Sequence, residues 1–366
     1  MTSKPNTYQP FNPNQVFSLN SNPGADHIIY LDFDGHTTTG TDWNDYHEHP
    51  TIISPAYDTD GDTSNFSTAE RESIWHIWQR VAEDFIPFNV NVTTAQPSDD
   101  QLKKTSDSDS QWGIRVVIGG DGSWAGPPNL GLAHLNSFND NIDTPTFAFS
   151  ENAAADNQEL DVAETISHEV GHTLGLKHDG QFSNEYYEGH ENGSDETAWT
   201  PIMGNGINNL TQWSKGEYTG ATNKEDDLEI ITSQNGFGYR EDDYSNSLIG
   251  AAALSINDGE VETYGIIEQN TDIDWFTFNS TTGNIDLYID PFERGPNLDI
   301  LANLYNASGQ LISSSNPIGY LYASFYVDLD PGQYYLSIEG TGQGDLDTGY
   351  SDYGSLGQYS ITGTIA

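Results

Sequence analysis

Residues 168–178 read HEVGHTLGLKH, and this stretch decides the fold and function that we expect. On an α-helix, positions i and i+4 share a face, so His168 and His172 can bind one metal ion from the same side. Gly175 can adopt a left-handed conformation that ends the helix and turns the chain back. The turn would allow His178 to supply a third imidazole.

Three neutral imidazoles leave the fourth coordination position of zinc open, which is typical of a catalytic zinc site. Glu169 lies one step round the helix, where its carboxylate can reach an attacking water without binding the metal. A structural zinc site is the alternative. Such a site normally has a fourth protein ligand, and this stretch instead carries a glutamate placed as a base.

The stretch resembles the extended zinc signature of the metzincin metalloendopeptidases. The resemblance implies a Met-turn beneath the metal, and Met203 in the segment PIMG (201–204) fits that role. Asp179, directly after the third histidine, resembles the reprolysin (adamalysin-like) branch. Its carboxylate either fixes the site by accepting a hydrogen bond from the backbone, Lys177 or a ligand histidine, or is exposed to solvent. Asn205 stands where other branches carry a tyrosine, which argues against a fifth protein ligand.

The same resemblance extends upstream to residues 131–134, GLAH. In metzincins an edge strand at this place pairs with an extended substrate, so we expect Gly131, Leu132 and Ala133 to bind peptide main chain by β-augmentation. The resemblance therefore implies protein or peptide substrates.

The pattern of apolar residues changes near residue 240. Before it, helical and strand-like patterns mix, and they predict helices over 67–85, over 160–174 and from about 222, with strands over 27–34, 88–94, 114–118, 131–138 and 146–150. Residues 241–366 hold only short alternating runs, which predict an all-β sandwich or jelly roll. They resemble the bacterial pre-peptidase C-terminal domain, a calcium-binding β-sandwich.

We therefore expect three regions. Residues 1–25 would be a flexible N-terminal segment. Residues 26–240 would form an α+β metzincin-type zinc peptidase domain, with a twisted mixed sheet, active-site helices and the Met-turn. Residues 241–366 would form the β-sandwich domain.

The net charge of the chain excludes some classes of binding partner. The 366 residues include 56 Asp+Glu and 11 Lys+Arg, a net charge of −45, which excludes nucleic acid or an anionic membrane as a partner held by charge. No run of about 18 apolar residues is present, so we expect no membrane span. Residues 1–25 lack the apolar core of a signal peptide, so a secreted protein would be present here in mature or trimmed form.

The chain contains no cysteine and hence no disulfide, and bound calcium could stabilise a secreted protein in place of disulfides. Asp58, Asp60 and Asp62 alternate around Gly61, and either a calcium site or a solvated acidic turn explains them. In the β-domain calcium is implied by resemblance, and the candidate ligands are Asp272, Asp274, Asp345 and Asp347.

Three functions remain in competition. The first is a secreted, monomeric zinc endopeptidase with Glu169 as general base. The second is a calcium-dependent extracellular binding or adhesion protein with a vestigial zinc site, and the intact Glu169 argues against it because binding needs no base. The third is a zinc hydrolase acting on a non-peptide bond, and the edge strand and Met-turn favour peptides over it.

Overall fold

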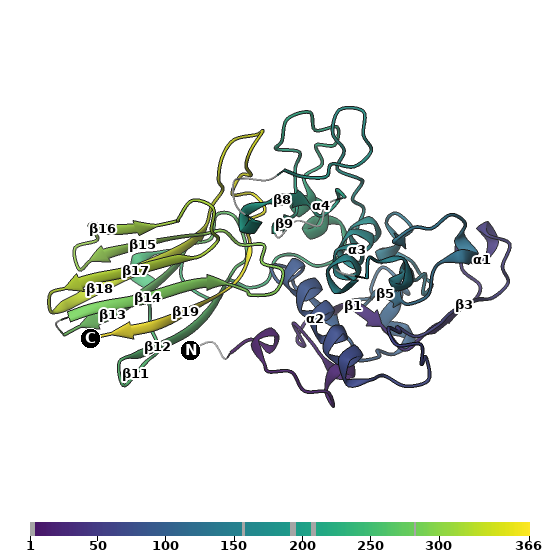
Figure 1. Cartoon of the computed structure of the whole chain (residues 1–366), viewed down its shortest axis with the longest axis horizontal. Helices are drawn as coiled ribbons and strands as arrows, with labels where there is room; N and C mark the ends of the chain where they lie inside the picture. Colours follow the sequence, from purple (N-terminus) through teal and green to yellow (C-terminus); the bar gives the residue numbers. More distant parts are fainter. Residues whose placement is uncertain (1–3, 156–157, 191–194, 206–209, 282) are drawn as a thin grey trace.

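The computed structural model describes residues 4–155, 158–190, 195–205, 210–281 and 283–366. Figure 1 shows a helix-containing part, coloured purple to teal, beside an all-β part, coloured green to yellow. No helix among the described residues is long and apolar enough to cross a membrane.

The helix-containing part is built on a five-stranded sheet of order β4-β1-β5-β7-β6. The first four of these strands pair in parallel, and β6 pairs antiparallel with β7 at one edge. Every residue of β1 and β5 is buried, as is usual for parallel strands. The strands are β1 (His27–Asp32), β4 (Val90–Thr93), β5 (Gly113–Ile118), β6 (Gly131–Leu132) and β7 (Thr146–Ala148).

Two long helices cover this sheet with a shared apolar core. Helix α2 (Thr68–Asp84) starts at a capping box, in which Ser67 and Glu70 bond each other's backbone N–H groups. Helix α3 (Gln158–Thr173) carries the zinc signature. The buried side chains of α2, such as Trp78, and of α3, such as Ile166, belong to one cluster. Both helices are confirmed close to their predicted bounds.

Two sequence predictions differ from the structure. The strand predicted over 131–138 ends after two residues, because Asn136 has positive φ and a 3₁₀ helix follows at Ser137–Asn139. Helix α4 (Asp227–Gln234) begins five residues later than predicted. Its N-cap is Asp226, whose side chain accepts a hydrogen bond from the backbone N of Glu229 at 3.0 Å.

Shorter elements complete this part. The hairpin strands β2 (His36–Thr38) and β3 (Ile52–Ser54) pair antiparallel, and β8 (Trp199–Pro201) and β9 (Leu210–Gln212) pair in parallel. Helix α1 spans Asp42–Tyr46. Short 3₁₀ helices lie at Asn6–Tyr8, Val16–Ser18, Asp99–Leu102, Ser123–Ala125, Ser137–Asn139, Ser150–Asn152, Asp195–Thr197 and Leu248–Gly250.

The described residues of 241–366 form two five-stranded sheets with no α-helix. Inward-facing residues of both sheets, such as Phe276 and Leu287, lie in one apolar cluster, so the all-β prediction is confirmed. One sheet contains β10 (Ala252–Ala253), β13 (Asp274–Ser280), β18 (Gly332–Gly340), β15 (Ile300–Asn306) and β16 (Leu311–Ser315). The other contains β11 (Ile256–Asn257), β12 (Glu260–Ile267), β19 (Gly357–Ile365), β14 (Gly283–Pro291) and β17 (Ala323–Leu329).

Buried polar contacts join the two parts. Glu83 at the end of α2 is fully buried and accepts hydrogen bonds from the backbone N and the Nε2 of Gln358, at 2.8 and 2.6 Å. The neighbouring Asp84 accepts from Asn297 Nδ2 at 2.8 Å and from Ser167 Oγ at 2.5 Å. Because Ser167 precedes the first histidine of the signature, the all-β part is connected to the active-site helix through two hydrogen bonds.

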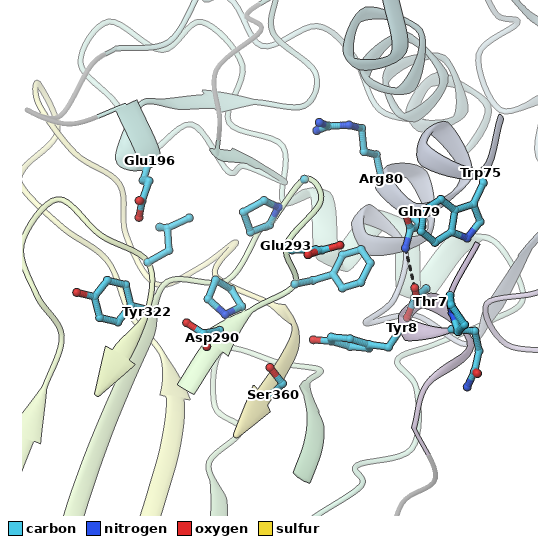
Figure 2. Close-up of a pocket in the computed structure, with 17 residues that line it drawn as sticks. Thr7, Tyr8, Trp75, Gln79, Arg80, Glu196, Asp290, Glu293, Tyr322 and Ser360 are labelled. Carbon is cyan, nitrogen blue, oxygen red and sulfur yellow. Dashed lines mark hydrogen bonds between the residues drawn. The ribbon is translucent and has the colours of Figure 1, made fainter. Parts of the chain in front are cut away.

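The N-terminal segment, which we expected to be flexible, packs against both parts. Val16 is fully buried in the core, and Thr7 donates to Gln358 Oε1 at 2.6 Å. Figure 2 shows a cavity of about 880 Å³ between this segment, α2 and the all-β part, where Gln79 Nε2 donates to the carbonyl of Thr7. None of the signature histidines lines this cavity, so its volume alone does not indicate the active site.

The buried interface predicts a pH-dependent stability. Burial raises the pKa of Glu83 to about 8, above its value in the unfolded chain. The protonated form therefore favours folding, and its contribution is present at low pH and is lost as pH rises through about 8. Glu83→Gln removes this titration. We expect the unfolding free energy of the wild type to fall more steeply than that of Glu83→Gln between pH 6 and 9, by up to about 1.4 kcal/mol per pH unit. The Tm of the wild type should likewise fall more steeply over this range. Parallel curves at fixed metal concentration would contradict this prediction.

Candidate active site

The end of α3 folds as the glycine in the signature predicts. Gly175 has a φ of 109°, and its N–H donates to the carbonyl of His172 at 3.0 Å. The N–H of Leu176 donates to the carbonyl of Gly171, also at 3.0 Å. These two bonds form a Schellman motif, which closes the helix and reverses the chain toward His178.

The turn brings the three histidines of the signature together. One ligand atom from each of His168, His172 and His178 lies within 4.8 Å of the others. His168 Nδ1 bonds the carbonyl of Ile202 at 2.9 Å, and His172 Nδ1 bonds the carbonyl of Leu176 at 2.8 Å. A carbonyl can only accept, so both rings carry their proton on Nδ1 and leave Nε2 free to bind a metal.

The third histidine is oriented by a carboxylate. His178 Nδ1 lies 2.9 Å from Glu185 Oε1, the kind of partner that fixes a metal-binding imidazole. Burial lowers the pKa of His168 to about 3 and also lowers the pKa of His172. These two rings are therefore neutral at pH 7, the form that binds a metal.

A turn containing Met203 supports the helix from below. The turn at residues 201–204 closes with a hydrogen bond from the N–H of Gly204 to the carbonyl of Pro201 at 2.8 Å. Met203 is fully buried, and a Cβ at Gly171 would lie 2.4 Å from its sulfur. The helix needs glycine there because the methionine packs directly against its backbone. Met203 therefore packs beneath the helix that carries His168 and His172.

Asp179 is tied to this turn through its backbone. Its N–H donates to the carbonyl of Met203, and its carbonyl accepts from the N–H of Tyr187, both at 2.7 Å. The side chain is buried and Oδ2 has no hydrogen-bond partner, which excludes the solvent-exposed alternative. Burial raises the pKa of Asp179 to about 7, and repulsion from Glu225 adds to this rise.

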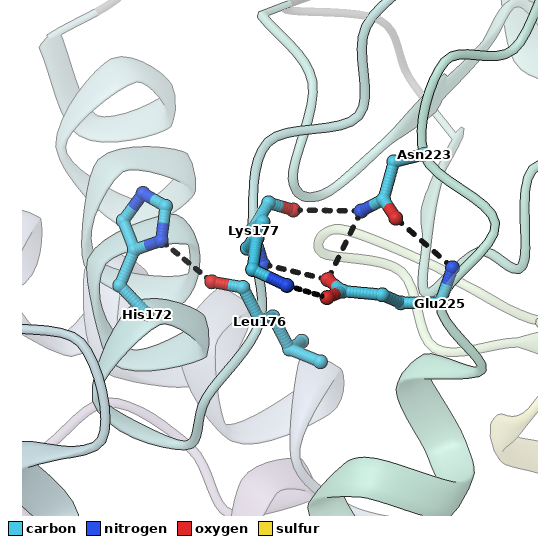
Figure 3. A network of polar contacts seen from close by, with 5 residues as sticks. All are labelled: His172, Leu176, Lys177, Asn223 and Glu225. Atoms are coloured by element: carbon cyan, nitrogen blue, oxygen red, sulfur yellow. Dashed lines mark hydrogen bonds and ion pairs between the residues drawn. The ribbon is translucent and has the colours of Figure 1, made fainter.

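The loop between the second and third histidines is held by hydrogen bonds to two residues that precede α4. Figure 3 shows Glu225 bonded to both the backbone N–H and the Nζ of Lys177. Asn223 Nδ2 donates to the carbonyl of Lys177 and to Glu225, both at 3.1 Å. Sequence analysis placed Asn223 and Glu225 in a helix. They instead fix the loop that carries His178.

The side chain of Glu169, on α3, lies against the edge strand β6. Its side chain is 8% exposed, and a Cβ on Gly131 would lie 2.7 Å from Glu169 Oε1. Burial raises the pKa of Glu169 to about 8. β6 consists of Gly131 and Leu132, has no further strand on its outer side within the described sheet, and is followed by Ala133 outside the strand.

Two cavities flank this glutamate. One of about 360 Å³ borders His168, and one of about 430 Å³ borders His172 and His178. Gly131, Glu169, Asn129 and Tyr186 line both. The arrangement is a cleft along β6, with the histidines and Glu169 at its centre.

A second group of metal-binding type lies at the start of the all-β part. Asp242, Glu268 and Asp272 offer ligand atoms within 4.8 Å of one another, as do Asp242, Asp243 and Asp274. Glu268, Asp272 and Asp274 are at most 5% exposed. Both Glu268 oxygens and one oxygen each of Asp243, Asp272 and Asp274 are buried without a hydrogen-bond partner.

Sequence analysis named Asp272 and Asp274 of this group and missed the other three. The run Glu241-Asp242-Asp243, at the boundary of the two parts, could have indicated this group of carboxylates. Consecutive acidic residues at that boundary lie close in space to the start of the all-β part. Glu268, directly after β12, gave no signal in the sequence.

The other predicted carboxylates are arranged differently. Asp58 and Asp60 lie within 4.8 Å of Glu70, and Asp62 is not part of that group. Asp58 Oδ1 already accepts from three backbone N–H groups of its own loop. Asp345 Oδ1 accepts from the N–H of Asp347 in a turn, and neither residue joins a group of three ligands within the described chain.

Residues 119–221 match a protein-family model described as metallo-peptidase family M12B, reprolysin-like. This segment contains the three histidines, Glu169, Met203 and the edge strand. The resemblance to reprolysin-like metallopeptidases is therefore confirmed over this segment. No match was found among the curated proteins.

Solved structures match parts of the chain. The pre-peptidase C-terminal domain of collagenase from Bacillus anthracis is 20% identical and covers 30% of this chain and 91% of its own, with a TM-score of 0.23. PliG from Aeromonas hydrophila, a periplasmic inhibitor of g-type lysozyme, is 10% identical and covers 32% of this chain and 96% of its own, also with a TM-score of 0.23.

Proposed function

We propose that this chain, whose residues 119–221 are those of a reprolysin-like metallopeptidase, is a secreted zinc endopeptidase with Glu169 as its general base. The observation that carries the proposal is the convergence of three histidines beside Glu169, under a free strand edge. We further propose that residues 26–240 form the peptidase domain, that residues 241–366 form the β-sandwich domain, and that the protein acts as a monomer.

The donor set fits zinc. Three imidazoles with oriented rings and free Nε2 atoms match a catalytic site with one open position. A zinc ion held by His168, His172 and His178 would polarise the scissile carbonyl and increase the acidity of the attacking water. The turn at Met203, which we propose as the Met-turn, supports His168 through the carbonyl of Ile202.

The chain's own groups supply the remaining steps. A cation held by the histidines would favour the ionised form of Glu169, which lies beside β6 and would take a proton from the attacking water and pass it to the leaving amine. Main-chain groups on the outer edge of β6 would hold the substrate extended, with affinity that depends little on its sequence. The bond to be cleaved would then lie over Glu169.

A second proposal concerns calcium. Four carboxylates, those of Asp243, Glu268, Asp272 and Asp274, bury oxygens that have no protein donor, and the exposed Asp242 lies beside them. Burying unpaired carboxylates is costly, and a divalent cation with oxygen ligands is what such a site accommodates. We propose that calcium binds there and fastens the start of the all-β part. This supports an extracellular location, where calcium replaces disulfides.

The competing functions fit the site less well. A calcium-dependent adhesion protein has no use for Glu169 between three metal-binding histidines and an open strand edge. A zinc hydrolase acting on a non-peptide bond does not need a strand edge along the cleft. The arrangement of β6 therefore favours a peptide substrate.

Metal removal tests the proposal. We expect the full-length protein to hydrolyse casein, to lose that activity after treatment with a chelator such as 1,10-phenanthroline, and to regain it with about one equivalent of zinc. Intact fold after chelation is checked by circular dichroism. Folded, zinc-loaded protein that cleaves neither casein nor a diverse peptide library would overturn the proposal.

A further inference from the structure

The cavity beside His168 holds two carboxylates that the peptide-cleavage chemistry does not use. Asp161 and Glu164 lie on α3, seven and four residues before His168, and both line this cavity of about 360 Å³. Positions spaced by three, four and seven share a helix face. At 1.5 Å per residue, the backbone positions of Asp161 and Glu164 lie about 10 and 6 Å before that of His168 along the helix axis.

Asp161 is buried with a free oxygen. Its side chain is 7% exposed, and Oδ2 accepts from the N–H of Ala154 at 2.8 Å. Oδ1 is buried without a hydrogen-bond partner. An unsatisfied buried carboxylate oxygen costs free energy, so a group that enters the cavity and donates to it would be bound favourably.

Glu164 lacks a close cation. Its hydrogen bond comes from Thr211 Oγ1, at 3.4 Å, and no ion pair within 4.0 Å involves it in the described part of the chain. The charged groups that interact with it are Asp84, Arg80 and Asp161. Among the described residues that line the cavity there is no lysine or arginine. The lining is therefore acidic, and Arg80, the cation that interacts with Glu164, is not part of it.

The geometry of β6 indicates which substrate residue enters this cavity. Leu130, directly before β6, lines only this cavity, whereas Leu132 in β6 and Ala133 directly after it line only the cavity on the other side of Glu169. Strand pairs are antiparallel two to three times more often than parallel. A substrate antiparallel to β6 would place the residue that follows the scissile bond at the Asp161 side.

We propose, on the basis of the peptidase function above, that this cavity selects substrates with lysine or arginine directly after the scissile bond. Asp161 and Glu164 are its specificity-determining residues. A long basic side chain would reach Glu164 first and Asp161 at the far end, giving each carboxylate a cationic donor. A neutral side chain of the same length would leave the buried Oδ1 of Asp161 without a donor.

Two peptides that differ at one residue test this proposal. The full-length, zinc-loaded enzyme is assayed on a quenched fluorescent peptide with lysine after the scissile bond and on the same peptide with norleucine there. Norleucine keeps the hydrocarbon stem and lacks the ammonium group. We expect kcat/KM to be at least about 30-fold higher for the lysine peptide, the lower end for a buried charge pair.

The variant Asp161→Asn/Glu164→Gln keeps the shape of the two side chains and the acceptor for Ala154. We expect the ratio of kcat/KM between the two peptides to fall at least 30-fold in this variant. Glu159→Gln is the control, because it neutralises a carboxylate on the same helix that does not line the cavity. The ratio should not change in that control.

The outcomes separate this proposal from the peptidase function. A ratio of kcat/KM near one in the wild type, or an equally high ratio in the double variant, would overturn the proposed selection of basic residues. The proposed peptidase function would not be affected by either result. A basic preference at a different substrate position would also overturn it. Absence of any cleavage would instead overturn the peptidase function. If the double variant does not fold, the wild-type ratio and Glu164→Gln alone still decide.

Discussion

Glu169→Gln is expected to retain one zinc per chain and to lose about 10²- to 10⁴-fold in kcat on any peptide substrate. The carboxylate of Glu169 makes no hydrogen bond to the described part of the chain, so the amide replaces it without breaking a contact. None of the three histidines depends on it for orientation, since Ile202, Leu176 and Glu185 fix their rings. The loss should therefore be in proton transfer alone.

The measurement combines zinc content by mass spectrometry with steady-state kinetics on one fluorogenic peptide. Glu159→Gln again serves as the control, because it removes a carboxylate from the same helix outside the cleft. Undiminished kcat in Glu169→Gln would remove the glutamate from the mechanism. Loss of zinc together with activity would show that Glu169 supports the metal site instead of acting as a base.

The local features of the site could be predicted because they depend on neighbours in the sequence. The helix with His168 and His172, the positive φ of Gly175 and the return of His178 all follow from spacing within eleven residues. The position of Met203 was accessible only through resemblance, since 25 residues separate it from His178. The structure shows the reason for its burial: the sulfur packs against Gly171.

Features that depend on distant segments could not be predicted. Asp161 and Glu164 gave no signal, because an acidic helix face next to the signature is ordinary in a chain with 56 acidic residues. Their significance depends on Gly131 of β6, which lines the cavity with them, and on Thr211, which donates to Glu164. The contact from Asn297 through Asp84 to Ser167 spans more than 200 residues and likewise has no sequence pattern.

The five carboxylates of the all-β part predict a large effect of calcium on stability. We expect calcium at 100 times its Kd to raise the unfolding free energy by about 2.7 kcal/mol, and the Tm by roughly 5–10 °C. The measurement is thermal unfolding of zinc-loaded protein with and without calcium. The variant Glu268→Gln/Asp272→Asn should abolish the shift, whereas Asp345→Asn should not, because Asp345 bonds only within its own turn.

The size of the calcium effect should depend on pH. Burial, with repulsion from neighbouring carboxylates, raises the pKa of Asp243 to about 8, of Asp274 to about 9 and of Glu268 to about 11. Without calcium these groups favour folding when protonated, so stability falls as pH rises from about 4 through these values. Calcium binds the ionised carboxylates and releases their protons, so its affinity rises with pH. The calcium-induced rise in Tm should therefore be larger at pH 8 than at pH 5, and an equal or smaller rise at pH 8 would contradict calcium binding by these carboxylates.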